Sequence, residues 1–324
     1  MRLFKKLALT VPLLALFLFP LVGSPAHAAP SANAHTIGAG TSYAGPSVQY
    51  VCNNQRYFAY TDIDHRINIW NFPSGGTAAT SQTTPFAPAL ACWNRELVVA
   101  WRSESGNDIF TGVFNGNDLS ISREWPQATT DEPITLTADS QPQQTLYLGW
   151  VGLDNPKHLN LMELQDPGST HLPITTFTDY THSVDPLTFA FGGVSFYYDS
   201  GVNTLFITWS AADASHRIIV GIFNGTTQLT DVSFSDSSPD APGMYAADGI
   251  VDLIWLGNTN THLYTGNWNG NGWSGGLQQS DTSFYAPSID GDGSIGGGTH
   301  LATAFTGTNN IVYLDSPSPY QGLA

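Results

Sequence analysis

The feature that most constrains the fold is a pattern that recurs six times along the chain. Each copy has an apolar strand that ends in an aromatic residue, then a polar turn, then a second apolar strand. The six aromatic positions, spaced 41 to 59 residues apart, are Tyr60, Trp101, Trp150, Trp209, Trp255 and Phe305. Self-similarity at such a period is typical of propellers and solenoids, in which each repeat is one structural unit. We therefore expect the six aromatic side chains to form the core of six such units.

Each copy predicts four strands. A first strand of small apolar residues follows a proline, as in the segments ALAC at 89–92 and LTFAF at 187–191, and small residues suit strands crowded around a central axis. The second and third strands flank the polar turn, and a more polar fourth strand fits before the next copy, for example at 120–127. Asn-Gly pairs at 115–116, 224–225 and 269–270 predict tight type I′ hairpins, because both central residues of that turn need positive φ.

The pattern predicts an all-β fold, a six-bladed β-propeller over residues 45–318. The last copy ends near Leu314 without room for a fourth strand, while a spare segment around 35–42 precedes the first copy. An N-terminal strand lent to the last blade would remove the open edge, so we expect residues 29–44 to close the ring and 319–324 to form a tail. The long spacing before Trp209 leaves five or seven blades open, and a pair of β-sandwiches is the rival architecture.

The N-terminus has the features of a secretion signal. Arg2, Lys5 and Lys6 precede an apolar stretch at 7–22, and the segment AHA at 26–28 supplies a small-x-small cleavage site. The stretch is short and broken by prolines, which disfavours a membrane anchor. We expect residues 1–28 to be removed and the mature chain to be secreted, without insertion into the membrane.

The charge of the chain excludes one class of partner. The sequence has 10 Lys and Arg against 26 Asp and Glu, and removing the three basic residues of the signal gives 7 − 26 = −19. Such a field repels phosphate backbones, so nucleic acid and anionic membranes are not expected partners. Neutral glycans, cations and basic proteins remain as partners.

The two cysteines, Cys52 and Cys92, lie late in the first strands of neighbouring repeats. Export permits a disulfide between them, and two small buried thiols are the alternative. Their number and spacing do not fit a zinc site.

Three segments carry a resemblance to known proteins: YLGWVGLDNPKHLNLM at 147–162, LFITWSAADASHRIIVGIFNG at 205–225 and DLIWLGNTNTHLYTGNWNGNGWSGG at 252–276. They resemble repeats of secreted bacterial β-propellers of the sialidase-like and lectin-like kind, and the last is similar to a blade of six-bladed fucose-binding lectins. Those lectins are expected to hold fucose with an Arg, a Glu and an aromatic residue, whereas Asp252 stands where the Arg would be. The arginine set and the Ser-x-Asp-x-Gly-x-Thr-Trp boxes expected of sialidases are not found in the sequence. The resemblance implies a sugar-binding propeller without sialidase activity.

In a propeller, the loops between strands 2 and 3 and between strands 4 and 1 share one face, which we call the 2–3/4–1 face. The predicted ligand-binding positions at the start of each third strand are Arg66, Asp108, His158, Arg217, His262 and Asn310, and Trp273 is the tryptophan that we expect to be exposed. Planar and charged groups with exposed aromatic rings are the usual means of holding a sugar. The alternative is that these residues serve only their own turns.

Two other functions remain open. Asp131, Glu132 and Asp185 precede first strands and are the candidate acid/base pair of a glycoside hydrolase, which needs two carboxylates about 5–10 Å apart. A structural or protein-binding module is the other alternative. We expect no cofactor, with calcium as the alternative: loop 290–294 has the alternating oxygens of a calcium loop but lacks the Gly and Glu that an EF-hand needs at its sixth and twelfth positions.

Overall fold

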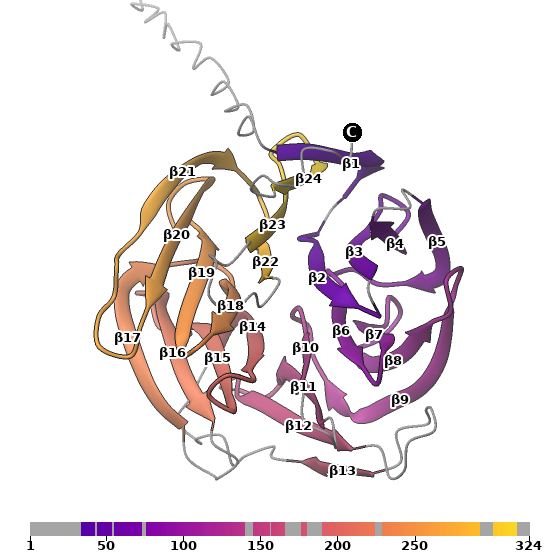
Figure 1. The fold of residues 1–324 in the computed structure, drawn as a ribbon, viewed down its shortest axis with the longest axis horizontal. Helices are drawn as coiled ribbons and strands as arrows, with labels where there is room; N and C mark the ends of the chain where they lie inside the picture. Colours follow the sequence, from indigo (N-terminus) through magenta and orange to yellow (C-terminus); the bar gives the residue numbers. More distant parts are fainter. Residues whose placement is uncertain are drawn as a thin grey trace, which may run out of the picture.

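A computed structural model shows six four-stranded antiparallel sheets arranged as blades around a central axis (Figure 1). The structure describes residues 34–42, 44–53, 55–72, 76–139, 145–155, 157–165, 176–179, 190–223, 229–291 and 301–315. The predicted all-β, six-bladed β-propeller is thus confirmed, and five or seven blades are excluded. Within the described ranges, no helix is long and apolar enough to cross a membrane. The predicted signal at 1–28 and the tail at 319–324 lie outside those ranges.

The first three blades follow the chain from the axis outward. Blade 1 consists of β2 (Ser47–Cys52), β3 (Gln55–Thr61), β4 (Arg66–Phe72) and β5 (Gly76–Thr83). Blade 2 consists of β6 (Ala89–Trp93), β7 (Glu96–Arg102), β8 (Asp108–Phe114) and β9 (Leu119–Thr129). Blade 3 consists of β10 (Thr135–Ala138), β11 (Thr145–Val151), β12 (Leu159–Gln165) and β13 (Thr176–Asp179).

The remaining blades complete the ring. Blade 4 consists of β14 (Ala190–Asp199), β15 (Thr204–Ala211), β16 (Arg217–Phe223) and β17 (Leu229–Ser237). Blade 5 consists of β18 (Gly243–Ala247), β19 (Ile250–Leu256), β20 (His262–Trp268) and β21 (Leu277–Thr282). Blade 6 consists of β22 (Ser288–Gly291), β23 (Leu301–Thr306), β24 (Ile311–Asp315) and, from the other end of the chain, β1 (Ala34–Thr41).

The two ends of the chain share blade 6. Strand β1 pairs antiparallel with β24, with His35 opposite Leu314, and it forms the outer edge of that sheet (Figure 1). The predicted N-terminal closing strand is therefore present. It covers the backbone donors and acceptors that β24 would otherwise leave open.

The predicted aromatic column fills the spaces between blades. All six side chains are buried, with Tyr60 the most exposed at 6%. One cluster packs Ile67 and Ile69 of blade 1 against Val99 and Trp101 of blade 2, and another joins blades 2 and 3 around Trp125. Each sheet is thus apolar on both faces and buries them against its neighbours.

Two local predictions are wrong. The Asn-Gly pairs of blades 2 and 5 do not form two-residue type I′ turns: Asn115 and Asn269 do not have positive φ, and each side-chain oxygen instead accepts two amides of a longer loop. The pair at 224–225 lies outside the described residues. Both central residues have positive φ instead in the hairpins between first and second strands, at Asn94–Arg95 and Asp248–Gly249.

The first strand of blade 4 also differs from the prediction. The segment LTFAF was expected to form it, whereas β14 runs from Ala190 to Asp199 and is interrupted by a bulge between Phe191 and Val194. The extra residues of the bulge account for part of the long spacing before Trp209.

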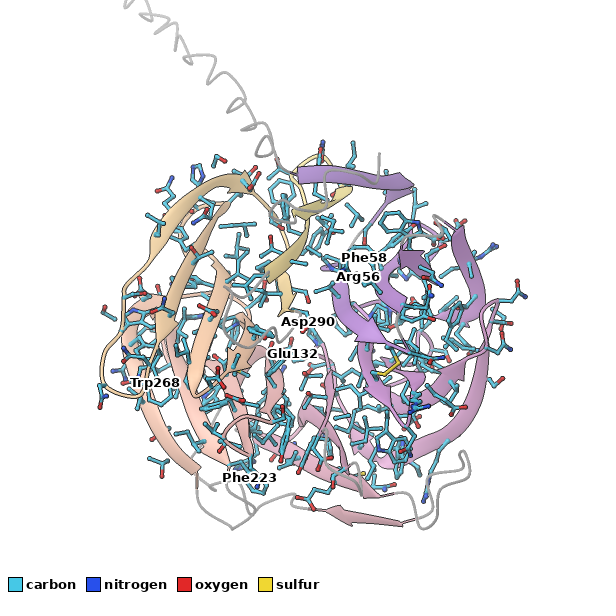
Figure 2. The ribbon with its side chains drawn as sticks, in the orientation of Figure 1. Arg56, Phe58, Glu132, Phe223, Trp268 and Asp290 are labelled. Atoms are coloured by element: carbon cyan, nitrogen blue, oxygen red, sulfur yellow. A yellow bond between two sulfur atoms is a disulfide. The ribbon has the colours of Figure 1, made fainter. Side chains whose placement is uncertain are left out.

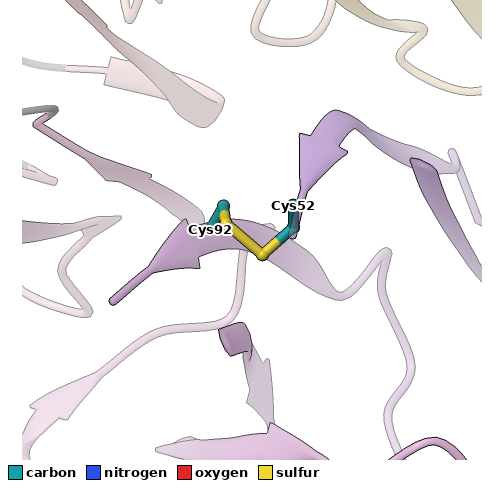
Figure 3. The surroundings of a disulfide bond; sticks show 2 residues. All are labelled: Cys52 and Cys92. Carbon is teal, nitrogen blue, oxygen red and sulfur yellow. A yellow bond between two sulfur atoms is a disulfide. The ribbon is translucent and has the colours of Figure 1, made fainter. Parts of the chain in front are cut away.

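A disulfide joins the innermost strands of blades 1 and 2. Cys52 at the end of β2 is bonded to Cys92 in β6, with 5.1 Å between their Cα atoms (Figure 3). The described residues contain no free cysteine. Of the two alternatives left by the sequence, the structure has the disulfide.

We predict that the double variant C52A/C92A is less stable than the natural chain. The bridge closes a sequence separation of 40 residues. Loop-closure entropy for that length gives a loss of about 3–4 kcal/mol in the free energy of unfolding. Urea unfolding followed by tryptophan fluorescence measures it, with the reduced natural chain as control. An unchanged midpoint would contradict the prediction.

We also predict that a chain starting at Ser42 self-associates more than a chain starting at Ala29. Without β1, the β24 edge is open to pairing with another chain, so dimers or larger assemblies and a lower melting temperature are expected. Light scattering after size exclusion tests this against a control chain that starts at Ala29. Two monomeric chains with equal melting temperatures would argue against a closing role for β1.

Candidate binding face and axial cavity

A Ser or Thr that recurs in the 4–1 loops connects them to the 2–3 loops on the 2–3/4–1 face. In the five described 4–1 loops, a buried Ser or Thr donates its amide to the carbonyl oxygen of the residue that precedes the third strand. The pairs are Ser42 to Asn310, Thr84 to His65, Thr130 to Asn107, Ser238 to His216 and Ser283 to Thr261, at 2.8–3.0 Å. Each hydroxyl also accepts the amide two residues further on, which forms a local turn. The two loop types are thus fastened to one another, which confirms that they share a face.

This contact corrects the register of one predicted site residue. Asn310 occupies the place of His65 rather than that of Arg66, because β24 begins one residue later, at Ile311. Asn310 and His65 also share positive φ, at 62° and 61°. The side chain of Ile311 therefore stands where the other five blades carry Arg66, Asp108, His158, Arg217 and His262.

These positions do not converge on one ligand. Each belongs to a different blade of the ring, so each could serve only a site of its own (Figure 1). Arg66 and Arg217 are exposed, and Asp108, His158 and His262 are half-buried. The face therefore offers separate, unequal positions rather than a single pocket.

Several of the positions are engaged within their own loops. The ring of His158 contacts Asp154 through Nδ1, while Arg217 donates from Nε to the Ser215 hydroxyl at 3.2 Å. Burial works to raise the pKa of Asp154, but hydrogen bonds from His158 outweigh it and hold the pKa below its ordinary range. The Nδ1 atom of His262 is buried and has no hydrogen-bond partner among the described residues.

Trp273 is not the exposed ring that the sequence suggested. Its indole stacks on Phe234 of blade 4, with ring centroids 4.1 Å apart, and its Nε1 donates to Asp236 at 2.6 Å. It also lies 5.7 Å from Trp255 of its own blade. The flanking Gly272 and Ser274 suggested exposure, but the loop folds back and places the ring between blades 4 and 5.

The two described candidate hydrolase carboxylates form ion pairs with a lysine. Lys157, from the 2–3 loop of blade 3, donates to Asp131 at 2.8 Å and to Glu132 at 2.6 Å. Asp185 lies outside the described residues. The described candidates are therefore two members of one ion triad.

A cavity of about 310 Å³ lies on the propeller axis. All six innermost strands and the five described 4–1 loops line it. Three carboxyl side chains border it, Glu132, Asp240 and Asp290, together with the aromatic residues Phe86, Phe196, Tyr197 and Tyr285. Glu132 and Asp290 lie near the centre of the ring (Figure 2). The described lining contains no Lys, Arg or His.

A glycine pair shapes the mouth of this cavity. Gly192 and Gly193 form the bulge of β14, with φ of 70° and 102°. A Cβ on Gly192 would lie 2.7 Å from the Pro239 carbonyl oxygen, and one on Gly193 would lie 3.2 Å from that of Pro133. Only glycine lets these two 4–1 loops approach β14 so closely.

The close approach of these loops places the carboxyl groups of Glu132 and Asp240 near enough to interact electrostatically. Burial, and then the negative charge of Glu132, raise the pKa of Asp240 to about 6. Asp290 is held differently, since it accepts the Gly291 amide at 2.8 Å and a hydrogen bond from Tyr197. Burial first, and then Asp290, raise the pKa of that phenol well above its ordinary value.

Metal binding has no support in the described part of the chain, where His, Cys, Asp and Glu form no group that could hold an ion. Most of the calcium-like loop, from Asp292 onward, lies outside the described residues.

Sequence reasoning missed the cavity and the Gly-Gly bulge, although the sequence contained a signal for the loops. A Ser or Thr stands four residues before the strand-opening proline in four blades, at 42, 84, 238 and 283. The cavity itself has no such signal, because its carboxyl groups at 132, 240 and 290 come from three different blades that the fold brings together.

No protein-family model and no curated protein matches the sequence. The fold is shared with solved lectins. AofleA from Arthrobotrys oligospora aligns with a TM-score of 0.58 and 10% identity, over 87% of this chain and 84% of that chain. The fungal lectin of Aleuria aurantia, described as a six-bladed β-propeller with a novel mode of fucose recognition, gives 0.58 and 11% over 88% and 94%. SapL1 lectin, in complex with α-methyl fucoside, gives 0.53 and 14% over 86% and 94%. At these identities the likeness establishes the fold.

We predict that Gly192→Ala destabilises the propeller more than Gly270→Ala. Both glycines have positive φ, but a Cβ at Gly270 has nothing within 4 Å. The control should lose about 1 kcal/mol, and Gly192→Ala about 2–4 kcal/mol, because loop 238–242 must also move. Urea unfolding measures both variants, and equal losses would refute the crowding argument.

Proposed function

We propose that this chain is a secreted carbohydrate-binding propeller that recognises a surface glycan without catalysis. Residues 1–28 would direct its export, and residues 45–318 would form the binding module behind a closing strand within 29–44. The observation that carries the proposal is the fastened pair of loops repeated around the 2–3/4–1 face. It presents polar side chains in blade after blade on a rigid support, as multivalent sugar binding requires.

Exposed apolar side chains on the same face support this function. Phe191 is 43% exposed, and its ring packs edge-on against His216, with centroids 4.6 Å apart. Ile63, Leu153 and Phe284 are exposed on other loops of the face. An exposed aromatic ring beside polar loops is a suitable platform for the apolar side of a sugar. Phe191 replaces Trp273 as the best stacking candidate.

The fold neighbours favour a glycan ligand and include lectins solved with fucosides. Asp252 stands where the resemblance calls for an arginine, so we do not restrict the proposal to fucose. The strongly acidic composition argues against nucleic acid as a partner.

The test is a glycan array probed with the mature chain from Ala29, with and without calcium. We predict saturable binding to one sugar class. Phe191→Ala should weaken binding at its site about fivefold, the loss expected for about 1 kcal/mol of aromatic contact. Ile250→Ala is the matched control, because Ile250 is equally exposed but follows a turn between first and second strands.

Three outcomes would overturn the proposal. A blank array would leave a structural or protein-binding module. Turnover of p-nitrophenyl glycosides would favour the hydrolase alternative. Equal effects of the two substitutions would remove Phe191 from the site.

A further inference from the structure

The axial cavity is separate from the loop positions of the proposed glycan face and has its own chemistry. Its volume of about 310 Å³ is at the lower end of the range for small-molecule sites, about 300–1,000 Å³. Carboxyl groups, hydroxyl groups and aromatic rings line it, and all six blades contribute. A cavity assembled by the closed ring is held rigidly, which favours binding without rearrangement.

The three carboxyl groups differ in the hydrogen bonds that they accept from the protein. Glu132 accepts a hydrogen bond from Lys157, and Asp290 accepts two, from Tyr197 and the Gly291 amide. The carboxyl group of Asp240 accepts no hydrogen bond from the residues that the structure describes, although the backbone of the same residue bonds to Ser238 and Ser210. The cavity therefore contains one largely buried carboxyl group without a donor.

The described lining of the cavity offers Asp240 no cation to pair with. The charged and titratable groups around it are Glu132 with Lys157 on one side, Asp290 and Tyr197 across the cavity, Tyr285 on the last 4–1 loop, and His216 beneath Ser238. The ammonium of Lys157 is already shared between Asp131 and Glu132. The internal segments that the structure does not describe contain no Lys or Arg by sequence. These segments do contain His171, His182 and His300. A cationic ligand would supply the positive charge that the described lining lacks.

The walls favour an organic cation over a bare metal ion. Phe86 lies under the guanidinium of Arg102, 5.2 Å from the ring centroid, which holds the ring at the cavity. Tyr197 packs edge-on against Tyr245 with centroids 4.8 Å apart. Aromatic faces attract ammonium groups, and the described residues offer no set of metal ligands.

We propose that the axial cavity binds a small organic ammonium ion, which pairs with the carboxylate of Asp240 and lies against Phe86, Tyr197 and Tyr285. This site is independent of the glycan-binding face. The net negative charge of the chain would attract such a ligand toward the cavity.

The ligand should compete with a proton. Because the pKa of Asp240 is raised to about 6, the group is mostly ionised at pH 7.5 and about nine-tenths protonated at pH 5. Affinity for a cation that does not titrate should therefore fall about tenfold from pH 7.5 to pH 5. Binding near pH 6 should release a fraction of a proton.

The experiment is calorimetric titration of the mature chain with choline and with its uncharged isostere, 3,3-dimethylbutan-1-ol. We expect saturable choline binding at pH 7.5, and at least tenfold weaker binding of the isostere. Repeating the titration at pH 6 in buffers of different ionisation enthalpy measures the proton released. Asp240→Asn should lower choline affinity at least tenfold and remove its pH dependence.

The matched control is Asp231→Asn, which removes the same charge from an exposed position on β17, the outer strand of blade 4. It should leave choline affinity unchanged. Absence of saturable choline binding, equal binding of the neutral isostere, or an unchanged affinity of Asp240→Asn would each overturn the proposal. If Asp240→Asn fails to fold, the choline affinity of the natural chain between pH 7.5 and pH 5 tests the proposal instead, and an affinity that does not fall would overturn it. Glycan-array binding by Asp240→Asn shows whether the loop face acts independently.

Discussion

Burial of one blade against the next is the interaction on which this structure depends. Every sheet is apolar on both faces, and the clusters around Trp101, Trp125 and Trp255 each draw side chains from two consecutive blades. A single four-stranded sheet of this kind would expose two large apolar faces to water. The six repeats are therefore stable only as a ring, in which each provides the core for its neighbours.

That ring supports surfaces of different chemistry. At its rim, hydroxyl residues fasten the 2–3 loops to the 4–1 loops, so polar side chains are presented on a rigid base. At its centre, the same 4–1 loops turn inward and bring carboxyl groups together above the innermost strands. One short loop type thus serves both the proposed glycan face and the axial cavity, and the Gly192–Gly193 bulge sets how closely two of these loops approach.

The parts of the fold that the sequence predicts are those governed by local periodicity. The aromatic column, the six blades and the closing strand follow from the repeated pattern, whereas the sequence left open whether Cys52 and Cys92 form a disulfide. Trp273 was misread because its burial depends on Phe234 and Asp236, nearly forty residues away. The Asn-Gly turns were misread because Asn115 caps a longer loop through its side chain. The axial cavity was missed because Glu132 and Asp240 meet only once the ring is closed.

The closing strand also has a consequence for the order in which the chain can fold. Strand β1 is the first to be synthesised, but its partner β24 is the last, with His35 opposite Leu314. Contacts of such high sequence separation form late, because the loop entropy must be lost before the pairing is gained. The ring therefore cannot close until almost the whole chain is available. Such a chain has no closed ring during most of its synthesis, so its apolar blade faces stay exposed until the last strand is made.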